Sequence, residues 1–346
     1  MSLLVCSGAP VWCQPALLTI AEAQAEAIQN NPGLMAEKLG LPVADTAVVT
    51  AGLKPNPVLS VSSDHLDLLG TGFNPTNGAG PSETAVRVDV PLERGKKREL
   101  RLDNAGYARK IAEAKYADSV RRLRQDVTLA CIDVLAAKAK LALANDNLQA
   151  LNKVVQFNET RLKGGAVAPV ELTRARVAML QYRGSVRTAE LALLTARTHL
   201  ETLLGRRPAG TIDISGDLKV PLPAAGPNLR ELQTAAQTAR PDITAVRVDQ
   251  ARSQADLRLQ VANGTIDYVV GIEARRQQGV NGTGNSLGFF FSAPLPVYNR
   301  NQGEIARASR EQEQLRQSLA AVEAQVTSDV AGAYEEYESA RTLAAE

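Results

Sequence analysis

The most regular pattern in the chain lies in residues 120–163, which read VRRLRQDVTLACIDVLAAKAKLALANDNLQALNKVVQFNETRLK. Apolar residues recur there at alternating spacings of three and four, which is the heptad pattern of a helix that packs along another helix. No proline occurs from Leu92 to Lys163, so the pattern predicts a helix on the order of 100 Å long. The seam consists of Val120, Leu123, Val127, Ala130, Val134, Ala137, Leu141, Ala144, Leu148, Leu151, Val155 and Leu162.

A partner for this helix follows directly in the sequence. Gly164 and Gly165 predict the end of the long helix, and Pro169 predicts the start of a return helix. The return helix carries its own heptad pattern from Leu172 to Leu203, and Gly205 predicts its end. The sequence therefore predicts a helical hairpin over residues 92–205. A second apolar stripe on the long helix predicts one more neighbour, and it comprises Leu129, Ile132, Ala136, Ala139 and Leu143.

Composition argues for long helices and against an enzyme. Aromatic residues make up only 4% of the 346 residues, whereas alanine, leucine, arginine and glutamate dominate. The net charge of +2, with both signs interspersed, gives no basis for nucleic-acid binding. The three cysteines, Cys6, Cys13 and Cys131, fit no zinc or redox spacing, and His65 and His199 lie far apart. We therefore predict no catalytic residue, no cofactor and no metal site.

The start of the chain resembles the end of a secretory signal. Residues 1–15 are small and apolar, finish with Gln14-Pro15 and lack a basic beginning, so we interpret them as a signal-peptide remnant. Leu3-Leu4-Val5-Cys6 leaves open a lipid attachment at Cys6. No apolar stretch reaches the ~18 residues of a membrane-spanning helix.

An internal repeat organises the rest of the chain. Residues 19–24 match residues 228–233 at an offset of 209, and both segments begin with the pattern of a capping box. Pro91-Leu92 matches Pro294-Leu295 at an offset of 203. Each repeat is predicted to contain a helix, two strands and a long helical hairpin.

The two repeats define two domains, residues 16–226 and residues 227–346. At the offset of 203, Glu346 corresponds to Leu143, whereas the first repeat continues to Gly205. We therefore expect the second hairpin to be truncated, with about 62 residues missing by this alignment. The first helix contains Gly40-Leu41-Pro42, and proline in a helix costs ~3 kcal/mol, so a break or kink is expected there.

The predicted strands cover about residues 57–66, 83–90, 265–275 and 286–293, and apolar and polar residues alternate along them. Gly- and Asn-rich loops at 70–82 and 279–285 are predicted to join them in pairs. The alternation has two interpretations, a half-buried antiparallel sheet or a membrane β-barrel. The strands alone favour the first, but long hairpins attached to paired strands favour a tunnel that includes a barrel. In the barrel interpretation Val86, Val88, Ile266, Tyr268 and Phe289 face lipid, and Arg87, Asp89, Asp267 and Glu273 face the lumen.

Several motifs resemble those of a known family. Residues 91–98 (PLERGKKR), 165–176 (GAVAPVELTRAR) and 294–303 (PLPVYNRNQG) are similar to segments of TolC-type outer-membrane efflux proteins. They look most like the cobalt–zinc–cadmium subgroup. The resemblance covers nearly the whole chain from about Leu17.

The resemblance implies a fold that is mainly α with membrane β, namely a trimeric α/β-barrel tunnel. Each protomer would give four strands to a shared barrel in the cell outer membrane and helices to a tunnel that extends into the periplasm. The protein would be a passive duct for heavy-metal cations, working with a periplasmic adaptor and an inner-membrane RND pump. A duct for organic compounds is the alternative, followed by a periplasmic adaptor and then by a soluble coiled-coil scaffold or an enzyme with a helical domain.

The resemblance also implies a docking site at the turn of the hairpin. The turn at residues 163–171 would contact the adaptor, and its residues of interest are Gly164, Gly165, Val167 and Pro169. We expect Val167 to be exposed there. The simpler alternative is a bare turn that contacts nothing.

Overall fold

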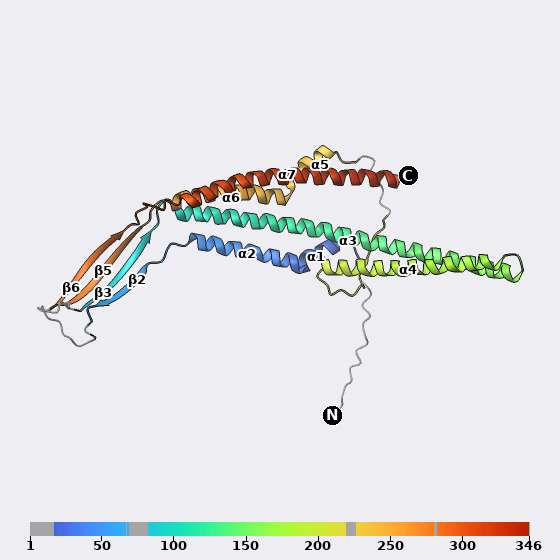
Figure 1. Cartoon of the computed structure of the whole chain (residues 1–346), viewed down its shortest axis with the longest axis horizontal. Helices are drawn as coiled ribbons and strands as arrows, with labels where there is room; N and C mark the ends of the chain where they lie inside the picture. The colour runs from blue at the N-terminus through green and yellow to red at the C-terminus, as the bar shows by residue number, and fades with distance from the viewer. Residues whose placement is uncertain (1–16, 67, 69–81, 219–225, 280–281, 346) are drawn as a thin grey trace, which may run out of the picture. The chain divides into compact units, whose positions relative to one another are not determined.

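The computed structural model describes residues 17–66, 68, 82–218, 226–279 and 282–345 (Figure 1). The chain divides into two compact units. The first unit contains residues 1–39, 116–226 and 338–346, and the second contains residues 40–115 and 227–337. Residues 1–15, which were predicted to be a signal-peptide remnant and include Cys6, and most of the predicted loop at 70–82 lie outside the described residues.

The elements occur in one order twice. The series α1-α2-β2-β3-α3 is followed, after α4, by α5-α6-β5-β6-α7. In chain order the elements are β1 (Leu17–Leu18), α1 (Ile20–Asn30), α2 (Pro32–Gly52), β2 (Val58–Asp64), β3 (Glu83–Leu92), α3 (Lys97–Lys163), α4 (Pro169–Leu203), β4 (Asp213–Ile214), α5 (Leu229–Ala239), α6 (Pro241–Asn263), β5 (Tyr268–Gly279), β6 (Gly282–Ser292) and α7 (Gln302–Ala345).

The first helix of each series is in fact two helices, so the prediction of one was wrong. Asn31 separates α1 from α2 with ψ of 118°, and Arg240 separates α5 from α6 with ψ of 125°. Both residues precede a proline, Pro32 or Pro241, whose ring disfavours the helical conformation of the residue before it.

Pro42 does not break α2, so of the expected break or kink the break is ruled out. The helix continues from Pro32 to Gly52 with Pro42 inside it. A proline removes one backbone hydrogen bond of the helix, and the turns on either side keep theirs. In the turn that follows, the Thr46 hydroxyl donates a hydrogen bond of 2.7 Å to the Val43 carbonyl.

The predicted capping box is confirmed at α1 and only half realised at α5. The Thr19 Oγ1 accepts a hydrogen bond from the Glu22 N–H, and the Glu22 carboxylate accepts one from the Thr19 N–H. This reciprocal pair lowers the pKa of Glu22, chiefly through the backbone bond. At α5 the Asn228 Oδ1 accepts from the N–H of Arg230, one residue before the position that a capping box uses.

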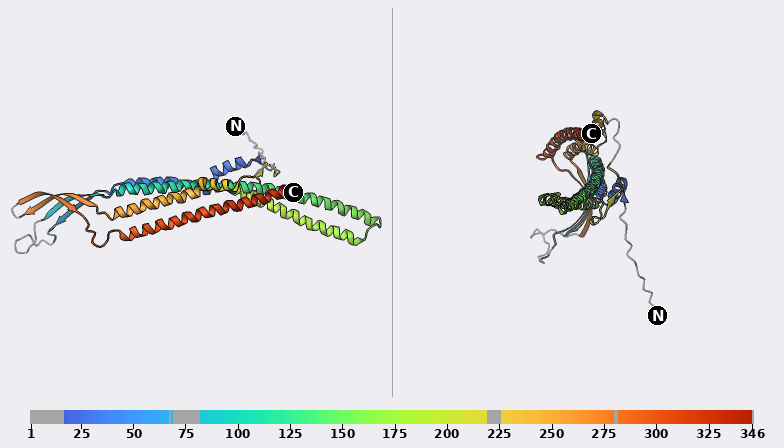
Figure 2. Two further views of the ribbon diagram at one scale, coloured as in Figure 1. Left: turned by 90° about the horizontal axis from the view of Figure 1, so that it is seen from above. Right: turned by 90° about the vertical axis from the view of Figure 1, so that its right-hand side faces the viewer.

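The hairpin of α3 and α4 lies in the predicted place but starts later (Figure 2). Gly95 and Lys96 both have positive φ, 70° and 56°, so the chain turns there and α3 begins at Lys97 rather than at residue 92. The predicted seam is the core of the first unit, which buries Leu123, Val127, Ala130, Val134 and Ala137 of α3, Leu193 and Leu200 of α4, and Ala23 and Ala27 of α1.

The second stripe of α3 has no covering neighbour among the described residues. Leu129 is 53% exposed and Leu143 is 61% exposed. The prediction of a second helix neighbour is therefore not met within this chain, because α1 and α4 pack on the seam instead.

Glu201 ties the end of α4 to the loop that follows it. Its side chain is buried, and its carboxylate accepts hydrogen bonds of 2.5 to 3.2 Å from the N–H groups of Ala209, Gly210, Thr211 and Ile212. Burial by itself would raise the pKa of Glu201, but the four backbone hydrogen bonds outweigh it and lower the pKa below the ordinary value of 4.5.

We predict that Glu201→Gln destabilises the protein by about 1–3 kcal/mol at pH 7, because an amide leaves buried N–H groups without acceptors. The folded state lowers the pKa of Glu201. The carboxylate therefore contributes to the free energy of unfolding above pH 4.5, and this contribution is lost as the pH falls through the pKa of the folded state. The difference between wild type and variant should therefore shrink in acid. Thermal unfolding in detergent at pH 7 and pH 4, followed by circular dichroism, measures this.

The control for that experiment is Glu190→Gln on the exposed side of the same helix, where Glu190 pairs with Arg187. This change should stay within about 0.5 kcal/mol of wild type. Equal losses of stability from both changes would show that the four backbone hydrogen bonds to Glu201 do not stabilise the protein.

The second unit contains a four-stranded antiparallel sheet in the order β2-β3-β5-β6 (Figure 1). All four predicted strands exist. The loop predicted at 279–285 is instead mostly strand, because β5 extends to Gly279 and β6 starts at Gly282. β5 begins at Tyr268, three residues later than predicted, and the preceding helix α6 ends at Asn263. Among the described residues no helix is long and apolar enough to cross a membrane.

Candidate functional site

The strand register separates apolar and polar side chains onto opposite faces of the sheet. Val88 lies opposite Leu59, Ile272 lies opposite Val88, and Phe289 lies opposite Ile272. The neighbouring row consists of Ser60, Arg87, Glu273 and Gly288 and therefore lies on the other face. The predicted alternation of Val86, Val88 and Phe289 against Arg87, Asp89 and Glu273 agrees with this register.

The apolar face is exposed in the isolated chain. Phe289 is 77% exposed, Val61 67% and Ile272 54%. All four strands contribute large, exposed side chains to this apolar face. They are Leu59, Val61, Val86, Val88, Val90, Val270, Ile272, Leu287, Phe289 and Phe291.

The polar face carries charges that are paired with one another. Arg87 contacts Asp89 at 2.8 Å, and Arg275 contacts Glu83 at 2.6 Å and Glu273 at 2.9 Å. The guanidinium of Arg87 also lies 4.0 Å from the ring centre of Phe290. These pairs hold the charged side chains along the strands and partly cover them, since the Glu273 side chain is only 11% exposed.

Sequence reasoning missed Glu83, Arg275 and Phe290 as members of this face. Arg275 follows Glu273 by two residues, so strict alternation would have found it. Phe290 gives no such signal, because it is an apolar residue at a polar position between Phe289 and Phe291.

Asp267 and Ile266, which were predicted to lie on a strand, precede β5. The Asp267 carboxylate accepts hydrogen bonds from the Lys97 ammonium at 2.7 Å and from the Arg94 N–H at 2.8 Å. Burial opposes the charged form, but these bonds outweigh it and lower the pKa of Asp267. Asp267 thus joins β5 to the start of α3.

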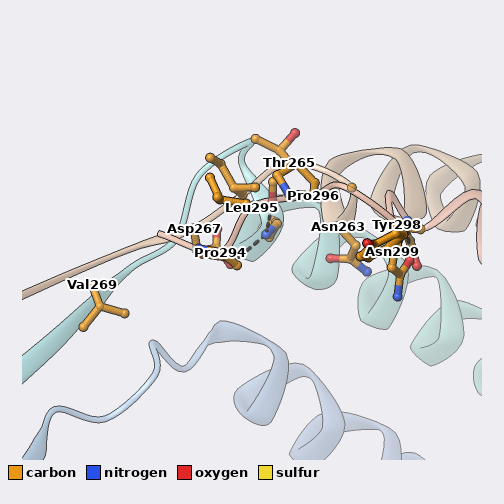
Figure 3. A pocket seen from close by; sticks show the side chains of 13 residues that line it. Asn263, Thr265, Asp267, Val269, Pro294, Leu295, Pro296, Tyr298 and Asn299 are labelled. Carbon is orange, nitrogen blue, oxygen red and sulfur yellow. Dashed lines mark hydrogen bonds and ion pairs between the residues drawn. The ribbon is translucent and has the colours of Figure 1, made fainter. Parts of the chain in front are cut away.

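A cavity of about 610 Å³ lies beside this junction (Figure 3). It is lined by Lys97, by Val269 and residues 263–267, and by residues 294–296 together with Tyr298, Asn299 and Asn301. The Asn301 side chain donates a hydrogen bond of 2.7 Å to the Gln260 carbonyl and so fixes the start of α7 next to the end of α6. The motif 294–303 therefore builds the connection between strand and helix.

The hairpin turn has the geometry of a Schellman motif, which is a hydrogen-bonded helix end with a left-handed residue. Gly165 has φ of 71°, its N–H donates to the Leu162 carbonyl, and the Ala166 N–H donates to the Arg161 carbonyl. Pro169 starts α4 at once. Val167 is half-buried rather than exposed as expected, and Val170 beside it is 50% exposed.

Within the described part of the chain, no group of three His, Cys, Asp or Glu side chains is placed to hold a metal ion. Cys131 is a free, buried thiol, and burial raises its pKa to about 11.

This architecture is that of outer-membrane efflux channels. Residues 24–206 match the outer membrane efflux protein family, and since this is more than half of the chain, the protein belongs to that family.

The chain is similar to the cobalt-zinc-cadmium resistance protein CzcC of Cupriavidus metallidurans, with 26% identity over 296 residues. That match covers 85% of this chain and 66% of CzcC, slightly less than two thirds of its length.

Solved structures agree on the fold, which is TolC-like. The crystal structure of CusC matches with a TM-score of 0.69 at 19% identity and covers 95% of this chain and 76% of CusC. VceC from Vibrio cholerae matches with a TM-score of 0.70 at 16% identity over 92% of this chain and 79% of VceC.

The ion pairs on the polar face leave no room for a side chain at Gly271. A Cβ there would lie 2.2 Å from Asp89 Oδ1 and 3.3 Å from Arg87 Nε. We predict that Gly271→Ala separates this pair and costs about 1–3 kcal/mol, which lowers the melting temperature by several degrees. The matched change is Gly284→Ala on β6, where a Cβ meets no atom of the described residues within 4 Å. An unchanged melting temperature for Gly271→Ala would contradict this account of the polar face.

Proposed function

We propose that the protein is a passive outer-membrane duct of a tripartite RND efflux system, which exports heavy-metal cations from the periplasm to the exterior. The proposal is carried by one observation: a sheet with an exposed apolar face, an ion-paired polar face and two open edges, in a chain of the outer membrane efflux protein family. No chemistry is assigned to the protein, which would act as a conduit.

The open edges support assembly into a closed ring. Within the described residues β2 pairs only with β3, and β6 pairs only with β5. An unpaired edge presents N–H and C=O groups that another strand can satisfy. We infer that β6 of one copy pairs with β2 of the next and that three copies close a shared barrel, as the family resemblance implies.

The apolar face supports insertion into the outer membrane. β3, β5 and β6 contain 10, 12 and 11 residues, which is long enough for the ~9–11 residues of a membrane-spanning strand, whereas β2 contains 7. Lipid would cover the valines and Phe289, while Arg87, Asp89 and Glu273 would face the lumen. Asp267, which immediately precedes β5, would face the lumen at its periplasmic end.

The repeated element order supports a duplicated architecture. We infer that residues 16–226 and 227–346 are two structural repeats. The hairpin turn at Gly164, Gly165, Val167 and Pro169 would then contact the periplasmic adaptor, which connects the duct to the inner-membrane pump.

The cargo is inferred from similarity. CzcC is named for cobalt, zinc and cadmium resistance, and the motifs at 91–98, 165–176 and 294–303 look like those of that subgroup. We therefore place divalent heavy-metal cations ahead of organic compounds as cargo.

A deletion strain tests the function directly. We predict that loss of the gene lowers the tolerated concentration of zinc, cobalt or cadmium severalfold and leaves antibiotic tolerance unchanged, and that the gene supplied in trans restores it. Growth should be compared on these metals, on nickel and copper, and on several antibiotics. Sensitivity to antibiotics alone would assign the duct to organic compounds.

The two faces of β2 can be distinguished with neighbouring cysteines. In a variant without Cys6, Cys13 and Cys131, we predict that a membrane-impermeant maleimide labels Ser60→Cys in the lumen and does not label Val61→Cys in lipid. Mass spectrometry of intact cells treated with the reagent measures both. Strong labelling at position 61 and none at position 60 would reject the orientation.

The docking turn can be tested with a photo-crosslinking residue at Val167. We predict crosslinks to the periplasmic adaptor, and far fewer from Leu191, which is 64% exposed farther along α4. Crosslinks from Val167 only to another copy of the chain would favour a bare turn without a docking role.

A further inference from the structure

Four segments of the second unit meet where the strands give way to helices. They are residues 52–57, 93–101, 260–267 and 294–302. Arg98 donates a hydrogen bond of 2.5 Å to the Gly52 carbonyl, Lys97 contacts Asp267 at 2.7 Å, and Asn301 contacts the Gln260 carbonyl at 2.7 Å. These contacts fix the segments next to one another.

The junction is strongly basic, although the whole chain has a net charge of only +2. Its segments hold seven cations, namely Lys54, Arg94, Lys96, Lys97, Arg98, Arg101 and Arg300, against three carboxylates, namely Glu93, Glu99 and Asp267. Two of these cations are neutralised in ion pairs, Arg101 by Glu93 and Lys97 by Asp267. The other five are exposed, and we call them the junction belt: Lys54, Arg94, Lys96, Arg98 and Arg300.

Large apolar side chains stand exposed among these cations. Leu53 is 60% exposed, Leu295 82%, Val297 62% and Tyr298 91%. In a loop between a strand and a helix, such exposure needs a covering surface.

The belt is continuous with the apolar face of the sheet. The guanidinium of Arg94 lies 4.4 Å from the ring centre of Tyr268, and that ring packs 5.1 Å from Phe291 on the apolar face. A surface that covers Phe291 with apolar chains would therefore place its polar boundary at Arg94. Aromatic side chains and snorkelling cations are favoured at such a boundary, and anionic headgroups attract the cations further.

We propose that the junction belt binds the phosphate headgroups of anionic phospholipids in the periplasmic leaflet of the outer membrane. Leu53, Leu295, Val297 and Tyr298 would insert between the headgroups and the acyl chains. The inference rests on the proposed insertion of the sheet into that membrane. It fixes the depth of the duct, because the cations cannot enter the hydrocarbon and the apolar residues do not favour water.

The test uses the full chain in detergent, immobilised and exposed to fluorescent phosphatidylglycerol or phosphatidylcholine. The belt variant is K54Q/K96Q/R300Q. It leaves out Arg94 and Arg98, because their side chains donate hydrogen bonds to Tyr268 and to the Gly52 carbonyl and so support the fold of the junction. The control is K140Q/K153Q/R183Q, which removes the same charge from exposed positions in the hairpin. Circular dichroism melting verifies that both variants are folded, and Lys54→Gln alone provides a milder change.

The wild type should prefer phosphatidylglycerol at least tenfold, and 0.5 M salt should weaken that preference. One cation near a membrane surface contributes about fivefold, so Lys54→Gln should lose about that factor and the triple belt variant most of the preference. The control variant should keep it.

Unchanged phosphatidylglycerol binding by the folded belt variant would overturn the proposal, as would equal binding of both lipids by the wild type. Loss of a co-purifying protein from the belt variant, with lipid binding intact, would assign the belt to a protein partner instead. A chain that leaves cells without detergent and binds neither lipid would refute the proposed function itself.

Discussion

The backbone hydrogen bonds at the edges of the four-stranded sheet are the constraint on which the rest of this structure depends. Among the described residues β2 and β6 each have one neighbouring strand, so about half of their N–H and C=O groups have no strand partner there. The apolar face adds a second demand, because Val61, Ile272 and Phe289 are exposed to an extent that water does not favour. We propose that further copies of the chain and a lipid surface satisfy both demands together.

The hairpin buries its apolar seam and pairs its backbone N–H groups largely with residues of the same chain. The seam of α3 is buried by α1 and α4, and Glu201 supplies acceptors for a loop that would otherwise bury free N–H groups. The stripe with Leu129 and Leu143 resembles the apolar face of the sheet, because both are exposed apolar surfaces that another molecule could cover. Each unit is thus internally packed on one side and open on another, which suits a protomer of a ring.

Periodicity predicted the elements that extend over many residues, because apolar spacing of 3–4 or of 2 accumulates along the chain. The α3 seam and the alternating faces of β3 and β5 were predictable in this way. The turn at Gly165 was predictable from its pair of glycines and the proline that follows. The start of α3 was not, because Lys96 has a φ of 56°, a left-handed conformation that a lysine rarely adopts and that its residue type does not predict. The position of Asp267 was missed because its ion pair with Lys97 joins residues 170 apart in sequence. Phe290 was missed because its contact with Arg87 joins residues that are even farther apart in sequence.

One measurement tests most directly whether copies of the chain complete the sheet. Cysteines at Ser60 on β2 and Ser286 on β6, in a variant without the native cysteines, would be treated with a bifunctional maleimide in outer membranes. Both positions lie on the polar face of an edge strand, so pairing of β6 with β2 brings them near each other across the boundary between copies. We expect covalent products of two and three copies and none larger. Single copies alone, or a ladder that continues beyond three, would contradict it.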